Sequence, residues 1–380
     1  MMNGTSTTHT QAVVPTLHTN AASSSRVVDD DDGKLTKVKG TSSYSKPSVD
    51  GINVNSSGDR KSLTLDSAAR SSTVANLDDY DCCYGNGSGN GNGSTESRML
   101  ISADGTEIYA NAVGDPLKQA IVFIHGFVWS FMAFDDIFED VEWMSRFYLV
   151  RYDVRGHGRS GKPKEDEAWE WKRFAEDFDA VVEAYKLHKP FVAGWSLGGC
   201  HLLDILTLHP VDYVAGIINI AGATYLDDTQ LEKLATPEGR DYIHRMSVLP
   251  SVEDFQSGAE DFVDACCRTL PYEVRERCLG NIMIQPRSTM VHSLTRKQRV
   301  ETFEMVGKTM LPCLLIFGDE DELIMIDELE RQYREVWRNL TVEVVEGGCH
   351  VPWTKTQRDV AAVFSKKTLA WIDFVMQSQN

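Results

Sequence analysis

The fold is decided by residues 191–199, which read FVAGWSLGG. The apolar start of this stretch suits a buried strand, and the leucine-rich run from Leu202 to Leu208 suits a helix. The pattern Gly-x-Ser-x-Gly at 194–198 therefore falls where a strand turns sharply into a helix, which is the context of a nucleophile elbow. Side chains at the flanking glycines would collide with neighbouring backbone. We therefore predict a strained turn that lifts the hydroxyl of Ser196 clear of the sheet.

A second loop is expected to lie beside this elbow. The apolar run at 120–124 predicts a central strand, and the loop after it reads HGF at 125–127. In folds with a nucleophile elbow, this loop and the residue after the nucleophile each supply one backbone N–H to an oxyanion hole. We therefore predict an oxyanion hole formed by the N–H groups of Phe127 and Leu197. For His125 we favour a role in shaping the loop over a role in proton transfer.

Two further loops carry a candidate acid and a candidate base. A buried-strand pattern at 314–317 is followed by four acidic residues at 319–322. Of these, Asp321 is the residue we expect to orient a histidine, and Asp319 is the alternative. His350 lies on a glycine-rich loop just past a short valine-rich strand. The resulting chain order of serine, aspartate and histidine is one in which catalytic triads occur.

Other conspicuous residues are assigned structural roles. Residues 153–160 read DVRGHGRS and follow a strand pattern, so we interpret them as a turn that bridges two core elements. Asp153 and His157 are given no catalytic role for this reason. Cys349 precedes His350 directly, and two adjacent side chains do not easily point at the same target. We therefore interpret Cys349 as structural too.

The composition divides the 380 residues into two parts. Residues 1–96 are rich in Ser, Thr, Asn, Gly and Asp and poor in aromatic and branched apolar residues, so we predict a disordered low-complexity arm. Residues 97–380 have the size of one α/β domain. Within this domain the stretch 223–310 has helical character and predicts a helical insertion.

Strand and helix patterns alternate along the predicted domain. A hairpin signal joins strands at 98–102 and 107–112, and apolar strand patterns then alternate with helix patterns up to a closing helix near 356–376. This alternation predicts a mostly parallel sheet whose first strand is antiparallel. Ligands are expected beyond the carboxyl ends of the strands, where the motifs lie.

Together these motifs resemble those of the α/β-hydrolase superfamily, from about Arg98 to the C-terminus. The matching stretches are residues 124–127, 153–160, 194–199, 317–321 and 348–352. The resemblance implies a mostly parallel central sheet with helices on both faces, and it makes the helical insertion a cap. It also implies a branch of the superfamily that works without a cofactor or a metal.

The resemblance implies an acyl-serine mechanism, with Ser196 as nucleophile, His350 as base and then acid, and Asp321 as its orienting residue. Epoxide hydrolases and haloalkane dehalogenases are similar in sequence pattern but carry a carboxylate at the nucleophile position. Ser196 therefore argues against both. The leading hypothesis is a serine hydrolase that cleaves an ester or lactone of a small, apolar-to-amphipathic molecule.

Three alternative functions stay open at this point. A cofactor-free haloperoxidase (perhydrolase) and a C–C hydrolase use the same triad. A ligand sensor or binding protein would keep the fold with slow turnover. Four aromatic residues flank the predicted catalytic loops: Phe131, Trp129, Trp195 and Trp353. The three tryptophans are the candidates to bind substrate, and core packing is favoured for at least two of the four residues.

The charge and the cysteines limit the expected partners. The net charge of −18 disfavours nucleic acid and anionic membranes as partners. No signal-peptide pattern or membrane-spanning run is recognised in the sequence. The eight cysteines are scattered without a metal-like spacing, which favours free thiols in a reducing compartment. We therefore expect a cytoplasmic protein whose partner is a small-molecule substrate; the sequence leaves its oligomeric state open.

Overall fold

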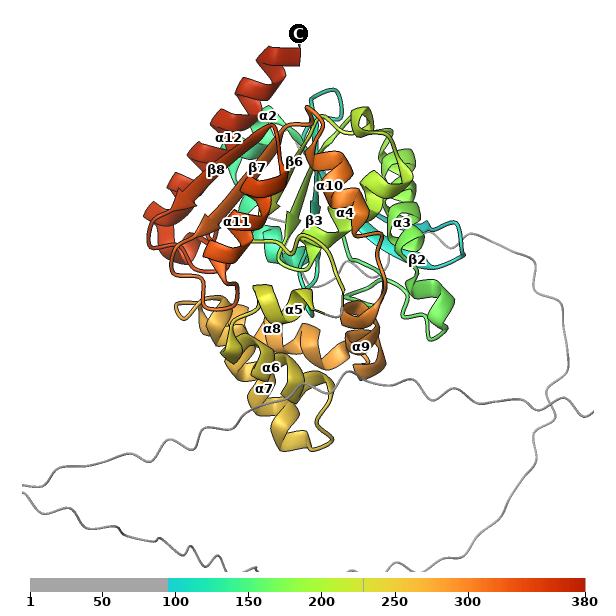
Figure 1. The fold of residues 1–380 in the computed structure, drawn as a ribbon, viewed down its shortest axis with the longest axis vertical. Coiled ribbons are helices and arrows are strands. Elements are labelled where there is room, and N and C mark those ends of the chain that lie inside the picture. The colour runs from blue at the N-terminus through green and yellow to red at the C-terminus, as the bar shows by residue number, and fades with distance from the viewer. Residues whose placement is uncertain (1–94, 228, 380) are drawn as a thin grey trace, which may run out of the picture. The chain divides into compact units, whose positions relative to one another are not determined.

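Eight strands form one sheet in the computed structural model, which describes residues 95–227 and 229–379 (Figure 1). The arm predicted for residues 1–96 lies almost wholly outside the described residues. The order across the sheet is β1-β2-β4-β3-β5-β6-β7-β8. The strands are β1 (Glu96–Ile101), β2 (Glu107–Val113), β3 (Ala120–Ile124), β4 (Tyr148–Tyr152), β5 (Phe191–Trp195), β6 (Gly216–Ile220), β7 (Cys313–Gly318) and β8 (Leu340–Val345).

The prediction of a mostly parallel sheet is confirmed, but the antiparallel strand is β2 and not β1. The six strands from β4 to β8 in the sheet order pair in parallel. Strand β2 pairs antiparallel with both β1 and β4. Strands β1 and β2 form a hairpin, so they run in opposite directions. Strand β2 is the one that pairs with β4, again antiparallel. Strand β1 therefore runs in the same direction as the rest of the sheet.

Helices cover both faces of the sheet (Figure 1). The described helices are α1 (Asp135–Phe138), α2 (Val141–Arg146), α3 (Trp171–Tyr185), α4 (Gly198–Leu208), α5 (Gln230–Leu234), α6 (Pro237–Ser247), α7 (Val252–Cys266), α8 (Tyr272–Ile284), α9 (Arg287–Thr295), α10 (Glu301–Gly307), α11 (Ile326–Val336) and α12 (Arg358–Gln379). Short 3-10 turns lie at Phe131–Phe134, Asp166–Trp169, Val211–Tyr213 and Lys355–Gln357.

The central strands explain why two layers of helix form. All five residues of β3 are buried, and they belong alternately to two apolar clusters. Phe123 packs in the cluster that includes Trp143 of α2 and residues of α12. Val122 belongs to the cluster that includes Phe178 of α3 and residues of α4. A strand that is apolar on both sides can lose its surface to water only when helices cover both faces.

The helices between β6 and β7 fall into two groups. Helices α5–α9, which we call the cap, gather at one end of the sheet, in yellow to orange at the bottom of Figure 1. Helix α10 instead packs its Phe303 and Val306 into the core cluster shared with α4 and α11. Just past α9, the buried Arg296 forms an ion pair at 2.7 Å with the buried Asp204 on α4. This pair anchors the end of the cap to the helix that follows Ser196.

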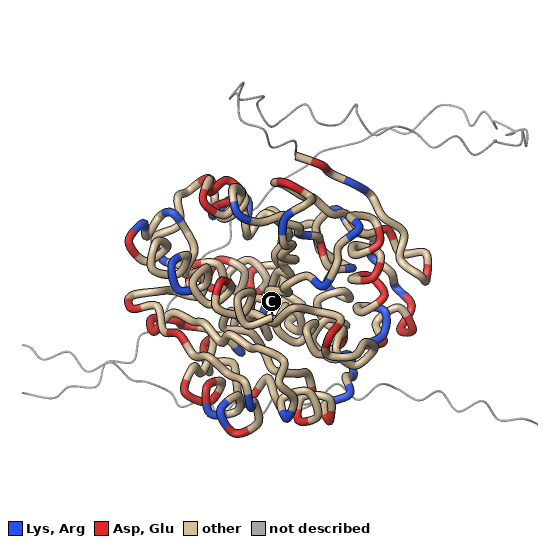
Figure 2. Tube along the Cα trace, turned by 90° about the horizontal axis from the view of Figure 1, so that it is seen from above, with Lys and Arg blue, Asp and Glu red and all other residues tan. Residues whose placement is uncertain are grey.

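The charged residues are spread around the described part of the chain. Figure 2 shows Asp and Glu interspersed with Lys and Arg along the trace. Among the described helices, none combines the length and apolar character needed to cross a membrane.

Candidate active site

The turn between β5 and α4 holds Ser196 in a strained backbone conformation. Its φ angle is +53°, in the left-handed region that non-glycine residues rarely adopt. The Ser196 N–H donates to the carbonyl of Ile220 at 3.1 Å. The Ser196 carbonyl accepts from the N–H groups of Gly199 and Ala223, both at 2.9 Å. Backbone from the end of β6, from the segment just after it and from the start of α4 therefore fixes the turn and offsets its strain.

Two glycines allow the backbone to approach this turn closely. A Cβ at Gly198 would lie 2.3 Å from the carbonyl oxygen of Ile124, which is the steric conflict expected for a glycine that flanks the elbow. A Cβ at Gly126 would lie 2.8 Å from the Cβ of Ser196. Gly126 therefore lets the loop after β3 sit directly against the serine.

Three non-glycine residues with positive φ angles follow neighbouring strands at this end of the sheet. Val128, Ser196 and Ala221 have φ angles of +55°, +53° and +43°. They follow β3, β5 and β6, which are neighbours in the sheet. Strained residues persist where the surrounding structure imposes them, and they cluster at functional sites. A β-branched residue such as Val128 gives no sequence signal for positive φ, so its strain was not predicted.

Ser196 lines a small, mostly apolar cavity together with Phe127 and Leu197. The cavity has a volume of about 60 Å³ and lies between the carboxyl ends of the strands and the cap. Within the part of the chain that the structure describes, the backbone N–H groups of Phe127 and Leu197 donate no hydrogen bond. The remaining wall consists of Ala223, Tyr225, Leu226, Gln230, Leu231, Leu234, Ala235, Gly239, Ile243, Phe262, Leu294, Leu323 and Ile324.

Asp321 and His350 form a buried hydrogen-bonded pair. His350 Nδ1 donates to Asp321 Oδ2 at 2.6 Å, and the two side chains are 1% and 0% exposed. The other carboxylate oxygen, Oδ1, accepts from the N–H groups of Leu323 and Ile324 at 2.9 and 3.0 Å. These bonds hold Asp321 in place. A proton on Nδ1 leaves the Nε2 of His350 as the ring nitrogen with a free lone pair.

The neighbouring acid, Asp319, lies in a different environment. Asp319 is exposed, and its carboxylate accepts from the N–H of Gly347 at 2.7 Å. That contact ties the loop after β7 to the loop that carries His350, but it does not reach the imidazole ring. Of the two acids that the sequence left open, Asp321 is the one that contacts His350.

The structure links Ser196 to His350 through Trp195. The Trp195 indole N–H donates to the carbonyl of His350 at 2.8 Å, and the two rings lie 5.3 Å apart. Nε2 of His350 is buried and has no hydrogen-bond partner among the described residues, Ser196 included. The bond from Trp195 was not predicted, because nothing in the sequence around Trp195 indicates which distant carbonyl its indole meets.

The three candidate substrate-binding tryptophans pack against one another instead of lining the Ser196 cavity. The Trp195 ring lies 5.1 Å from that of Trp129 and 5.2 Å from that of Trp353, and all three are buried. Trp129 and Trp353 line a second cavity, of about 380 Å³, between the loop after His350 and the start of α8. Trp195 is fully buried and lines neither of these cavities.

The turn at 153–160 contains buried polar groups whose hydrogen bonds are satisfied within the fold. The two oxygens of Asp153 accept from the N–H groups of Phe131 and Arg159, each at 2.7 Å. His125 donates from Nδ1 to the carbonyl of Gly126 at 2.8 Å, and its Nε2 accepts from the N–H of Val154 at 3.0 Å. Burial lowers the pKa of His125 well below its usual value, so the ring is neutral.

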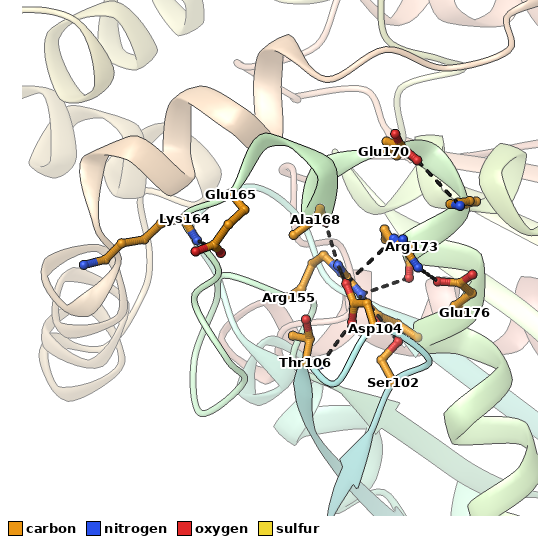
Figure 3. A network of polar contacts seen from close by, with 12 residues as sticks. Ser102, Asp104, Thr106, Arg155, Lys164, Glu165, Ala168, Glu170, Arg173 and Glu176 are labelled. Carbon is orange, nitrogen blue, oxygen red and sulfur yellow. Dashed lines mark hydrogen bonds and ion pairs between the residues drawn. The ribbon is translucent and has the colours of Figure 1, made fainter.

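Arg155, from the same turn, is enclosed by acceptors (Figure 3). It donates to Asp104 at 2.8 Å and to Asp177 at 2.6 and 2.8 Å. It also donates to the carbonyls of Ala168 and Arg173. The guanidinium therefore joins the β1–β2 hairpin, the segment before α3 and α3 itself. This is the bridging role that the sequence predicted for the turn.

The buried Cys349 faces the cap. The interaction of its thiol with Cys267, the residue just after α7, lowers the pKa of the Cys267 thiol. Across residues 95–227 and 229–379, no three His, Cys, Asp or Glu side chains are arranged to hold a metal ion.

The strand order, the helices on both faces and the strained serine turn after β5 are those of the α/β-hydrolase fold. A family model described as serine aminopeptidase, S33 (Hydrolase_4) matches residues 115–357. The chain belongs to that family.

Individual relatives are more distant. The "Probable oxidoreductase EphD" of Mycobacterium tuberculosis is 41% identical over 86 residues, which are 23% of this chain and 14% of that protein. The "Putative 2-succinyl-6-hydroxy-2,4-cyclohexadiene-1-carboxylate synthase" of Bacillus subtilis is 22% identical over 70% of this chain and 96% of its own length. The "Non-heme chloroperoxidase CPO-A1" of Kitasatospora aureofaciens is 22% identical over 66% of this chain and 91% of its own length.

Solved structures share the fold. A putative aryl esterase from Burkholderia cenocepacia is 23% identical with a TM-score of 0.64, covering 73% of this chain and all of that one. A bromoperoxidase from Bacillus anthracis is 18% identical with a TM-score of 0.57, covering 74% of this chain and all of that one. At these identities the likeness describes the fold alone.

Proposed function

We propose that this protein is a hydrolase that cleaves an ester or lactone of a small, apolar-to-amphipathic molecule. In the proposed reaction Ser196 is the nucleophile, His350 the base and Asp321 the residue that orients the base. One observation carries the proposal: Ser196 shares a mostly apolar cavity with Phe127 and Leu197, whose backbone N–H groups have no partner among the described residues. Unpaired N–H donors beside a strained serine are suited to stabilise an oxyanion.

The first half of the proposed reaction forms an acyl-enzyme. Nε2 of His350 takes the proton of Ser196 as Oγ bonds to the carbonyl carbon, and the carbonyl electron pair moves to oxygen. The N–H groups of Phe127 and Leu197 donate to this oxyanion. The carbonyl re-forms as the alkoxide leaves with the proton from His350. Asp321 accepts from Nδ1–H throughout and stabilises the imidazolium.

The second half releases the acid. Water gives a proton to Nε2 of His350 and attacks the acyl carbon, and the same two N–H groups stabilise the second oxyanion. The bond to Oγ of Ser196 then breaks, and Oγ takes the proton back. The free protein has no hydrogen bond between Ser196 and His350. Catalytic hydrogen bonds often shorten only when substrate is bound, so this geometry is compatible with the reaction.

The cavity supports a preference for small acyl groups. Its volume of about 60 Å³ is well below that of usual small-molecule sites, which span roughly 300–1,000 Å³. Its wall is formed by the cap as well as the core, so substrates longer than a few carbons require the cap to move. The apolar surface of a substrate suits this wall, since aliphatic and aromatic side chains dominate it.

The test uses a fluorophosphonate probe and 4-nitrophenyl esters of graded acyl length. The purified protein is expected to label with the probe and to hydrolyse short esters faster than long ones. Ser196→Ala should lose labelling and lower turnover by several orders of magnitude, because a triad acts as a unit. The matched control is Ser145→Ala, which removes an exposed hydroxyl on α2. Labelling of the Ser196→Ala protein would contradict the proposal.

Perhydrolysis is a second candidate, favoured by the match that covers 91% of the non-heme chloroperoxidase. Here hydrogen peroxide replaces water in the second half, so the acyl-enzyme yields a peracid that then oxidises a halide. Bromination of a phenol dye in acetate, peroxide and bromide measures this activity. A rate that depends on Ser196 and exceeds ester hydrolysis would make perhydrolysis the main activity.

A further inference from the structure

The cavity beside Ser196 has one amide in its otherwise mostly apolar wall. Its lining residues are aliphatic, aromatic or glycine, except for Ser196 and Gln230. Among the aromatic residues, Tyr225 adds a hydroxyl group. Gln230 is the first residue of α5 in the cap and is 1% exposed. The proposed reaction gives Gln230 no role.

A chain of donors fixes which way the Gln230 amide points. Glu328 lies in an ion pair with Arg331, whose hydrogen bond lowers the pKa of Glu328 to about 2, so this carboxylate only accepts. Gln332 Nε2 donates to Glu328 at 2.8 Å, which leaves the Oε1 of Gln332 as an acceptor. Gln230 Nε2 donates to that oxygen at 2.6 Å. The NH₂ group of Gln230 is therefore the end that faces Gln332.

The Oε1 of Gln230 is left without a partner. It is buried and accepts no hydrogen bond from any described residue. The NH₂ group of Gln230 donates to Thr224 and Gln332, and neither of these residues lines the cavity. The oxygen is therefore the end of the amide that is available to a ligand in the cavity. A buried carbonyl oxygen with no donor is costly, and few such groups occur in native proteins.

We infer that Gln230 is a specificity-determining residue, whose Oε1 accepts a hydrogen bond from a hydroxyl or N–H group on an otherwise apolar substrate. This inference rests on the proposed function, because it takes the Ser196 cavity as the site where the substrate binds. A bare alkyl ester fills the apolar wall but leaves this oxygen unpaired. A substrate with one hydrogen-bond donor at the right distance from its carbonyl fills the apolar wall and also pairs this oxygen.

A bound water is the alternative partner for this oxygen. Buried waters usually make about three hydrogen bonds to polar groups. Besides the amide, this cavity offers such a water the hydroxyls of Ser196 and Tyr225 and, from the backbone, the N–H groups of Phe127 and Leu197. Displacing such a water by a substrate hydroxyl also restores the hydrogen bond while adding apolar contact.

The experiment compares matched substrates with and without a donor. They are 4-nitrophenyl pentanoate, its 2-hydroxy and 3-hydroxy derivatives and their methyl ethers, together with the 4-nitrophenyl esters of N-acetylglycine and N-acetyl-N-methylglycine. For at least one donor position, the wild-type kcat/KM is expected to exceed that of the matched ester by about tenfold, the effect of one hydrogen bond. Gln230→Met, which keeps the volume but lacks the acceptor, should abolish this ratio.

Thr224→Val is the matched control, since it removes one acceptor of Nε2 and leaves the Oε1 of Gln230 in place. It should keep the preference. A wild-type protein that hydrolyses all these esters without preferring any donor overturns the inference, and so does a preference that survives Gln230→Met. The wild-type comparison can still overturn the inference if Gln230→Met fails to fold.

A binding measurement separates this inference from the proposed function. In Ser196→Ala, 3-hydroxypentanamide, 2-hydroxypentanamide and pentanamide are compared by the shift in Tm that each causes. A larger shift with a hydroxyl, lost when Gln230→Met is added, supports the role of Gln230 even if no ester is hydrolysed. Ester turnover that depends on Ser196, with equal shifts for all three amides, leaves the proposed function standing and overturns this inference.

Discussion

Two buried clusters of acidic and histidine side chains lie beyond the carboxyl ends of strands in this protein, and they use their polar atoms differently. Around Asp153, both carboxylate oxygens accept backbone N–H groups, and both ring nitrogens of His125 are paired. In the second cluster both carboxylate oxygens of Asp321 accept hydrogen bonds, but Nε2 of His350 is buried and has no partner in the described part of the chain. Each cluster contains an aspartate and a histidine, but only in the first cluster are all of these polar atoms paired.

This difference separates structure from chemistry. A buried polar group whose every site is paired stabilises the fold and has no capacity left for a ligand. A buried nitrogen held in one tautomer with its lone pair free costs stability, and it can take a proton from a group brought beside it. The unpaired N–H groups of Phe127 and Leu197 and the Oε1 of Gln230 belong to the same class. Substitutions at the fully paired cluster should therefore lower stability, and substitutions at the cluster with the unpaired nitrogen should lower the reaction rate.

The sharpest test of this comparison is Asp321→Asn. The amide cannot stabilise an imidazolium and favours the wrong tautomer of His350, so we expect ester hydrolysis to fall by roughly a thousandfold or more. Tm should change little, since Asn keeps the size of the side chain. Asp319→Asn is the matched control: it removes an exposed carboxylate two residues away and should leave kcat within a factor of a few. Equal losses in both variants would remove Asp321 from its proposed role.

The turn at 153–160, which carries Asp153 of the fully paired cluster and also Arg155, is expected to affect stability. Arg155→Met removes the cation between Asp104 and Asp177 and leaves the second acid buried, which we expect to lower the free energy of unfolding by about 3 kcal/mol or more. Denaturant unfolding measures this loss. The protein that remains folded should keep its kcat for short esters. A loss of kcat without a loss of stability would mean that the turn at 153–160 takes part in the chemistry.

A third test breaks the contact between the oxyanion loop and the serine. Gly126→Ala places a Cβ 2.8 Å from that of Ser196, so the loop must shift and carry the Phe127 N–H with it. Loss of one such donor costs on the order of a hundredfold in kcat. Gly280→Ala is the control, because a Cβ there has no neighbour within 4 Å. Wild-type kcat in Gly126→Ala would exclude Phe127 from the oxyanion hole.

The smallest effect concerns pH. Burial lowers the pKa of His157 to about 4, below the 6.5 of an exposed histidine. Between these values the unfolded chain binds a proton that the folded protein does not, so stability is full above pH 6.5 and is lost as the pH falls toward 4. One such group adds about 1.4 kcal/mol per pH unit to the slope. His157→Gln should flatten the slope by that amount, and His188→Gln, at an exposed position, should not.

Local patterns explain why much of this architecture could be predicted. The apolar runs of β3, β5 and β7 and the glycines of the elbow act within a few residues, so the sequence contains their whole cause. The direction of β2 could not be read in this way, since it depends on which strand of the hairpin meets β4. Gln230 gave no signal either, because its amide is oriented by Gln332, about a hundred positions later in the chain.

The tryptophans show a second limit of the sequence. Trp129, Trp195 and Trp353 flank loops that meet in space, and an aromatic residue in such a place suits a pocket or a core equally well. The rings contact one another at 5.1 and 5.2 Å. Edge-to-face contacts among three rings remove them from water. Which partner a ring finds is a long-range outcome, so the sequence alone could not choose.

The position of the cap has a consequence for how the protein is made. The cap separates β6 from β7, although these strands pair directly. A chain growing on the ribosome completes Ser196 and both oxyanion donors before the cap is synthesised, and it receives Asp321 and His350 only afterwards. Pairing across so long a loop is slow and comes late in folding. The newly made protein therefore carries the proposed nucleophile without its proposed base, and we expect it to be inactive until its last two strands have joined the sheet.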